Sequence, residues 1–227
     1  MFIAFKEIFT LENLLYLLKG TGYSVGIAIL SLFFGLILGI LGSCGKRSKN
    51  IILKGLANIY VEVIRGTPML LQILIIFSVI PSIYTAFSGK IMRMNPYLIG
   101  VVAMSINSGA YQTELIRSGI NAVDKGQTEA CETLGLSKFQ TMKFVILPQA
   151  FKHIVPPMIS ELITLTKDTS LISTIGAVEL LKGAQILGTN YYDVMSPYCI
   201  AVVYYLIITI VISLIGKKIE MGLALSD

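Results

Sequence analysis

The stretch DKGQTEACETLGLSKFQTMKFVILP, residues 124–148, is a charged segment that lies between two strongly apolar segments of the chain. It holds two signals for the start of a helix. Asp124 with Gln127, and Ser137 with Gln140, each have the spacing of a capping box, in which two polar side chains satisfy the free N–H groups of a first helical turn. The stretch therefore predicts two consecutive short helices.

The boundaries of these two helices are set by residues with special backbone requirements. Gly135 lies between them and suits the left-handed residue that ends a short helix. Pro148 has no backbone N–H, so we expect it to end the second helix or to kink it. The whole stretch predicts a helix–turn–helix that lies on a membrane surface and is exposed to a soluble partner.

The composition is that of an integral membrane protein. The chain has 227 residues, of which 55% are hydrophobic and only 14% charged, and its mean hydropathy is +0.78. A soluble domain is nearer a quarter charged. The net charge of +5 is spread over short connections, which argues against a nucleic-acid-binding face. We expect one transmembrane domain, residues 1–227, with no separate soluble domain.

Few residues in the sequence could bind a metal or act as a nucleophile. Cys44, Cys131 and Cys199 lie far apart, and there is one histidine, His153. No pair has the spacing of metal ligands or of a redox motif, so reduced thiols are favoured over a structural disulfide. We expect no metal site, and an intramembrane enzyme is disfavoured because no Ser/His pair or cluster of histidines and acids is evident.

Five segments are apolar enough for membrane helices, which need roughly 20 residues. They cover about residues 20–43, 55–80, 96–120, 149–166 and 197–215, so the predicted fold class is all-α with five transmembrane helices. Residues 65–68 interrupt the second segment, and Pro156 and Pro157 are expected to break the fourth. Residues 5–19 have an amphipathic pattern and are predicted to lie along the membrane surface.

Small residues in the first segment predict close helix packing. Gly22 with Gly26, and Gly35 with Gly39, are each four residues apart. This spacing lets the backbones of two membrane helices approach closely.

Basic residues decide the expected orientation, because they collect on the cytoplasmic side. One side carries Lys46, Arg47, Lys49, Lys54, Arg117, Lys125, Lys138, Lys143, Lys152, Lys217 and Lys218. The other carries Lys6, Lys19, Lys90, Arg93, Lys167 and Lys182. The sequence therefore predicts a cytoplasmic loop at residues 121–148, a cytoplasmic C-terminus and an N-terminus outside.

The charged stretch resembles the "EAA" signature of ABC-importer permeases, which is Glu-Ala-Ala, three residues, Gly, nine residues, Ile, one residue and Leu-Pro. Here the same spacing joins EAC at residues 129–131 to Gly135, Val145 and LP at residues 147–148. Cys131 replaces an alanine and Val145 an isoleucine. The segments YVEVIRGTP (60–68) with Gln72, NSGAY (107–111) with Glu114, and KDTSL (167–171) resemble motifs of the His/Glu/Gln/Arg/opine branch of type I importers.

The resemblance implies a type I ABC importer permease in the bacterial cell membrane. Such a chain pairs with a second permease subunit, as a homo- or heterodimer, binds two ATP-binding cassette ATPase subunits inside, and receives substrate from an extracytoplasmic amino-acid-binding protein. The sequence lacks a Gly-x(4)-Gly-Lys-Ser/Thr loop. We therefore expect no cofactor on this chain, which is not itself an enzyme, and ATP and Mg on the partner ATPase.

The resemblance also implies which residues contact the ATPase. The short helix after Asp124 offers Ala130, Cys131 and Leu134 as a small apolar face. Glu129 and Glu132 lie beside that face as charge contacts, and Gly135 holds the turn.

Charged residues inside membrane segments are costly and are functional candidates. Glu62 with Arg65, and Glu114 with Arg117, are three residues apart and are expected to pair. Glu161 has no basic residue three or four positions away. Two interpretations remain open: either Arg65 pairs with Glu161 across the bundle, or a positively charged ligand supplies the partner.

The resemblance favours the second interpretation, because permeases for basic amino acids tend to carry an acid where other relatives carry an amide. It implies import of arginine, lysine or histidine by alternating access, with glutamine or another neutral polar amino acid as the alternative. Transporter sites lie near the membrane midplane. The residues expected to bind substrate there, although each alone is more often a packing residue, are Glu161, Thr67, Gln72, Asn107, Ser108 and Tyr111.

Overall fold

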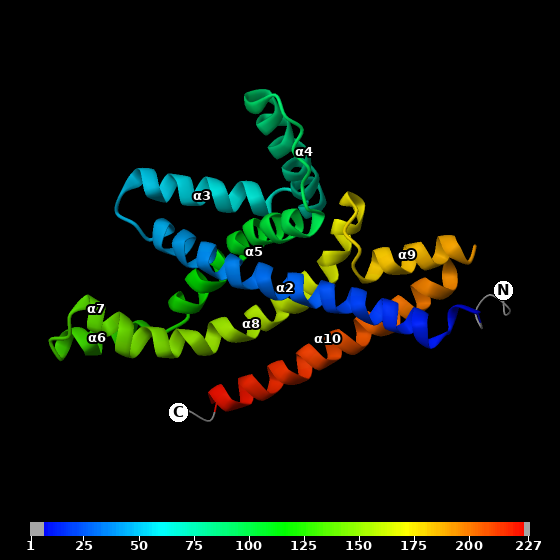
Figure 1. Ribbon diagram of the computed structural model, residues 1–227. Helices are drawn as coiled ribbons and strands as arrows, with labels where there is room; N and C mark the ends of the chain where they lie inside the picture. Colours follow the sequence, from blue (N-terminus) through cyan, green and yellow to red (C-terminus); the bar gives the residue numbers. More distant parts are fainter. Residues whose placement is uncertain (1–6, 225–227) are drawn as a thin grey trace.

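The computed structural model describes residues 7–224, and the regular structure in that range is entirely helical (Figure 1). In chain order the elements are α2 (Leu11–Lys46), α3 (Ile51–Arg65), α4 (Met69–Ser88), α5 (Pro96–Asn121), α6 (Lys125–Thr133), α7 (Lys138–Gln140), the π-helix η1 (Thr141–Ile146), α8 (Leu147–Asp168), the 3-10 helix η2 (Thr169–Ile175), α9 (Leu180–Asn190) and α10 (Met195–Ala224). The long helix α2 packs against α5, α8 and α9.

Helix α2 is longer than the predicted first segment. It runs without a break for 36 residues, and Thr10 caps its start by accepting a hydrogen bond from the Asn13 N–H at 3.3 Å. Residues 11–19 therefore extend the long helix that also contains the predicted first membrane segment. The reason is tertiary, because Leu17 is buried against α9 and α10. Phe5 and Lys6 belong to the amphipathic segment predicted at residues 5–19 and lie outside the described residues.

The contact between α2 and α5 depends on glycines. A Cβ atom added at Gly35 would lie 2.8 Å from Gln112 Nε2, and one added at Gly39 would lie 2.7 Å from Gln112 Cβ. This confirms the predicted close approach at the second glycine pair. Gly22 and Gly26 have open space around the same added atom, so the prediction for the first pair is wrong within this chain.

The predicted interruption at residues 65–68 is confirmed, and it divides the second segment into two helices. Helix α3 ends at Arg65 and α4 begins at Met69, with Pro68 in an extended conformation between them (φ −64°, ψ 134°). Proline cannot donate the hydrogen bond that a continuing helix needs. Helix α3 has 15 residues, about 22 Å at 1.5 Å per residue, which is too short to cross a membrane.

Prolines do not end the helix that follows the charged stretch. The chain stays helical from Lys138 to Asp168, with Pro148 in the first turn of α8 and Pro156 and Pro157 inside it. The expected break at Pro156–Pro157 is therefore wrong, and of the two alternatives for Pro148, an end of the helix or a kink, the end does not occur. The π-helix η1 lies directly before Pro148. Its wider turn changes the hydrogen-bond register where the proline N–H is missing.

A buried carboxylate joins three helices at one end of the molecule. Glu179 is fully buried and caps α9, accepting from the N–H groups of Leu181 at 2.9 Å and Lys182 at 2.8 Å. Its second set of donors is the hydroxyls of Ser24 on α2, at 3.3 Å, and Tyr205 on α10, at 3.1 Å. These contacts fix the segment between α8 and α10.

Three helices in the described part of the chain are long and apolar enough to cross a membrane: α2, α4 and α10. A fourth span is possible if Lys138–Ile175 and Leu180–Asn190, which meet at 50°, count as one bent unit. The apolar spans thus number three to four, against the five predicted. In Figure 1, α6 and α7 lie at the end of the molecule toward which α10 runs, and α9 lies at the end where α2 begins.

Candidate functional site

Three of the predicted substrate-binding residues form one hydrogen-bonded network at the break between α3 and α4. The Gln72 amide donates to the Ile64 carbonyl at 2.8 Å, to the Thr67 carbonyl at 3.1 Å and to Thr67 Oγ1 at 2.8 Å. Its Oε1 accepts from Asn107 Nδ2 on α5 at 2.9 Å. The network joins the end of α3 and the start of α4 to α5. The side-chain polar atoms of Thr67, Gln72 and Asn107 that were expected to face substrate are hydrogen-bonded to one another instead.

A second network lies one residue further along α5 and contains the predicted acid. Ser108 Oγ donates to Glu161 Oε1 on α8 at 2.9 Å, and it accepts from Gln112 Nε2 at 3.0 Å. Gln112 is fully buried and also donates to the Leu32 carbonyl at 3.0 Å. Sequence reasoning missed Gln112, although its position four residues after Ser108 places both side chains on one helix face.

Glu161 has no basic partner within the described residues, where both ion pairs involve Glu114. The expected neighbour, Arg65, instead lies over the Tyr111 ring, with its guanidinium carbon 5.2 Å from the ring centroid. The suggested Glu161–Arg65 pair is therefore not formed, and neither is the predicted Glu62–Arg65 pair. The charged group that interacts with Glu161 is another acid: Asp168, two turns further along α8.

Tyr111 belongs to a different part of the molecule from Glu161. It lines an open cavity of about 440 Å³, whose lining does not include Glu161, together with Lys46, Val61, Glu62, Arg65, Gly66 and Glu114. At one side of this cavity Glu114 accepts from Lys46 Nζ at 2.6 Å and pairs with Arg117 at 2.7 Å. The predicted Glu114–Arg117 pair is confirmed, and Lys46 extends it to α2.

The charged stretch folds as two short helices with a left-handed turn between them. Gly135 has φ +74°, and the Leu136 N–H donates to the Cys131 carbonyl at 3.0 Å across the turn. At the second helix both bonds of the capping box are present: Ser137 N–H to Gln140 Oε1 at 2.9 Å, and Gln140 N–H to Ser137 Oγ at 3.3 Å. The local signals for the turn and the second cap are confirmed.

The first predicted capping box is only half formed. Asp124 accepts from the Gly126 N–H at 2.7 Å, but the Gln127 side chain does not return to the start of the helix. Gln127 Oε1 instead accepts from Gln149 Nε2 on α8 at 3.2 Å. A tertiary contact has replaced the local one.

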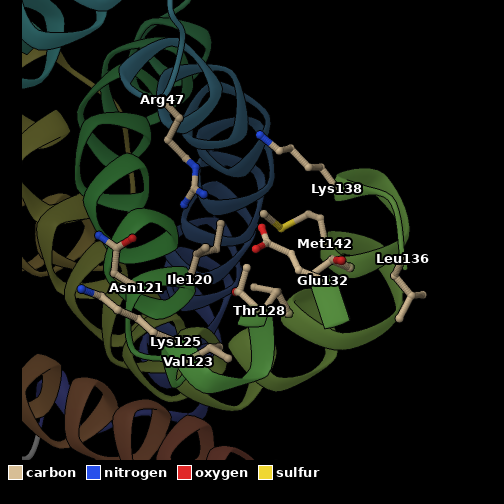
Figure 2. Close-up of a pocket in the computed structure, with 12 residues that line it drawn as sticks. Arg47, Ile120, Asn121, Val123, Lys125, Thr128, Glu132, Leu136, Lys138 and Met142 are labelled. Atoms are coloured by element: carbon tan, nitrogen blue, oxygen red, sulfur yellow. The ribbon is translucent and has the colours of Figure 1, made fainter. Parts of the chain in front are cut away.

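Helix α6 presents only part of the expected ATPase-coupling face to the outside. Leu134 is 78% exposed, and Ala130 and Glu129 are exposed as well. Cys131 was expected on this face, but it is 4% exposed because its side of the helix packs inward. Glu132 points into a pocket between α6 and the ends of α2 and α5 (Figure 2).

Permeases named for two different amino acids, arginine and glutamine, are similar to the chain over nearly its whole length. The Arginine transport system permease protein ArtQ of Bacillus subtilis is 37% identical over 218 residues, 96% of this chain and 97% of that protein. The Glutamine transport system permease protein GlnP of Escherichia coli is 35% identical over 204 residues, 90% of this chain and 91% of that protein.

A solved structure also matches the fold. The chain superposes on the structure described as "Crystal structure of an amino acid ABC transporter with histidines" with a TM-score of 0.84 and 34% identity, covering 91% of this chain and 94% of that one. The model of the family "Binding-protein-dependent transport system inner membrane component" matches residues 22–224. The chain therefore belongs to this family and is a multi-pass membrane permease of an amino-acid ABC transporter.

Proposed function

We propose that this permease carries a basic amino acid (arginine, lysine or histidine) and that Glu161 pairs with the cation of the cargo. The observation that carries the proposal is the partly buried Glu161 carboxylate, which accepts one hydrogen bond from Ser108 and has no cation beside it in the described chain. A charge buried without a partner is costly. A cationic ligand removes this cost when it binds, so the site favours a basic side chain.

The surroundings of Glu161 strengthen the preference for positive charge. Asp168 adds a second carboxylate on the same side of α8. The neutral-cargo alternative required Arg65 to neutralise Glu161, whereas Arg65 lies over Tyr111. Relatives named for arginine and for glutamine are both similar to this chain, so relatedness alone does not choose between the two cargo classes.

We assign the remaining predicted residues to two kinds of role at this site. Ser108 holds the Glu161 carboxylate directly, while Gln72 and Asn107 hold the α3–α4 break next to it. Thr67 Oγ1 donates to the Val63 carbonyl and accepts from Gln72 Nε2, so Thr67 also holds the break. Tyr111 is exposed in the separate cavity beside Arg65, where its hydroxyl is available to hydrogen-bond an amino acid. Breaks in membrane helices commonly mark transporter sites.

The transport cycle we propose is alternating access driven from α6. The exposed side of α6, with Ala130 and Leu134, contacts an ATP-binding cassette subunit that carries ATP and Mg. An extracytoplasmic binding protein delivers the amino acid, and a second permease subunit completes the assembly. We further propose five membrane crossings, with α5 among them, the N-terminus outside and α6 inside.

The test is a change of selectivity in the reconstituted transporter, with its ATPase and binding protein. Glu161→Gln keeps the size and the Ser108 contact but removes the charge. We expect arginine uptake to fall by at least about tenfold, since a hydrogen bond to a charged group contributes about 1.5–3 kcal/mol. Residual glutamine uptake should change little.

The matched control is Glu12→Gln, which removes an exposed carboxylate in the first turn of α2. It should leave both uptake rates near wild type. An unchanged ratio of arginine to glutamine uptake in Glu161→Gln would contradict the assignment of Glu161 to the cargo cation.

A further inference from the structure

A large pocket lies behind α6, on the opposite side from its exposed face (Figure 2). Its volume is about 710 Å³. Its walls come from the ends of α2 and α5 and from α6, α7 and η1. The lining residues are Arg47, Ile120, Asn121, Val123, Lys125, Thr128, Glu132, Leu136, Lys138, Thr141, Met142 and Ile146. The transport cycle described above makes no use of this pocket.

Basic side chains outnumber acidic ones around the pocket. Arg47, Lys125 and Lys138 reach it from three different elements, against the single acid Glu132. Figure 2 shows the Arg47 and Lys138 side chains converging on the hollow from two sides. No ion pair involves these four residues in the described part of the chain. An excess of two positive charges around one cavity is repulsive unless an anion binds there.

One wall of the same pocket is apolar. Val123 and Ile146 are buried and belong to a hydrophobic cluster with Ala150 and Ile154, and Ile120 and Met142 pack against it. A pocket with basic groups on one side and an apolar wall on the other fits an amphiphile. A free inorganic ion would leave the apolar wall without a contact.

The position of the pocket also indicates its ligand. Arg47 directly follows α2, one of the helices apolar enough to cross the membrane. Asn121 is the last residue of α5. The pocket therefore lies at the ends of α2 and α5, a position that we assign to the depth of the lipid head groups. Basic pockets between membrane helices at that depth bind the head groups of anionic lipids.

We propose that this pocket binds the phosphate-bearing head group of an anionic phospholipid. The phosphate lies between Arg47 and Lys138, and the glycerol region lies along Val123 and Ile146. Such a lipid bridges α2, α6 and α7, and so it fixes α6 relative to the long helices. Glu132 lowers the positive charge of the site and weakens its hold on the phosphate.

The test measures lipid retention by the full-length permease in detergent. Dioctanoyl phosphatidylglycerol and dioctanoyl phosphatidylcholine are titrated separately, and bound lipid is counted by native mass spectrometry. We expect phosphatidylglycerol to bind more tightly than phosphatidylcholine. The double variant Arg47→Gln/Lys138→Gln should weaken phosphatidylglycerol binding by about 30-fold, because each basic residue near an anionic head group contributes about a fivefold step.

The matched control is Lys49→Gln/Lys54→Gln, which removes the same charge from exposed neighbouring positions outside the pocket. It should change binding little. Glu132→Gln should tighten binding, which tests the site with a variant that removes no positive charge. Loss of helical circular dichroism would identify a double variant that fails to fold, and Glu132→Gln then decides the question.

Three results would overturn the proposal. Equal binding of the two lipids would show that the phosphatidylglycerol head group is not selected. Displacement of phosphatidylglycerol by equimolar inorganic phosphate would show a simple phosphate site. Unchanged lipid retention by Arg47→Gln/Lys138→Gln would show that the phosphate does not bind between these two residues, and lost binding of the ATPase by the same variant would show that the pocket receives a protein partner instead.

Discussion

The segment α6–α7 and the polar networks around α5 are held together in different ways. The α6–α7 segment is stabilised mainly by contacts within a few residues, such as the Ser137–Gln140 box and the left-handed Gly135. The networks around α5 join residues far apart in the chain, such as Ser108 with Glu161 and Asn107 with Gln72. A local change should therefore disturb the first region alone, whereas a packing change should disturb the whole bundle.

The largest effect is expected where α2 meets α5. Gly39→Leu forces a side chain against Gln112 and the backbone of Thr113. Overpacking of this kind lowers the free energy of unfolding by up to about 3 kcal/mol, which corresponds to a fall in Tm of about 6–12 °C. The measurement is thermal unfolding in detergent.

Gly26→Leu is the control on the same helix, because an added Cβ there meets nothing within 4 Å. Its Tm should stay close to wild type. Equal destabilisation by both variants would show that helix propensity, rather than contact with α5, explains the loss at Gly39.

A smaller and local effect is expected at the turn between α6 and α7. Gly135→Val places a β-branched residue at φ +74°, which costs about 1–2 kcal/mol although space is available around the site. We expect faster amide exchange in α6 and α7 and less uptake per ATP hydrolysed. Both are measured in the reconstituted transporter.

Gly135→Asn is the matched variant, because asparagine tolerates the left-handed conformation. It should retain most of the coupling between hydrolysis and uptake. Wild-type uptake per ATP in Gly135→Val would refute the link between this turn and coupling.

The smallest effect is expected at the second helix start. Ser137→Ala removes the acceptor for the Gln140 N–H, a loss of about 1 kcal/mol. Amide exchange at Gln140 should become about fivefold faster. Ser137→Asp keeps an acceptor at the cap and should restore most of the protection, while exchange in α5 stays unchanged in both variants.

The sequence could predict the parts of the molecule that depend on neighbouring residues. The left-handed Gly135 and the Ser137–Gln140 box follow from side chains only a few positions apart. The Glu114–Arg117 pair is of the same kind, because three positions on a helix bring two side chains together.

The remaining features depended on contacts between distant residues. Gln127 lost its local bond because Gln149 reaches it from α8. Arg65 turned to Tyr111 rather than to either acid, since the aromatic face offers an alternative to an ion pair. Gln112 and the buried Glu179 were missed because most of their partners lie on other helices. Gln112 donates to the Leu32 carbonyl on α2, and Glu179 accepts from Tyr205 on α10, and the spacing of residues along the sequence does not show such contacts.

The central claim is that the permease selects a positively charged amino acid, whose cation pairs with Glu161. Competition between amino acids for uptake tests this selectivity most directly. Uptake of labelled arginine by the reconstituted wild-type transporter is measured against an excess of unlabelled lysine, histidine, glutamine or glutamate. The account predicts strong inhibition by lysine and histidine and little by glutamine or glutamate. Stronger inhibition by glutamine than by lysine would contradict it.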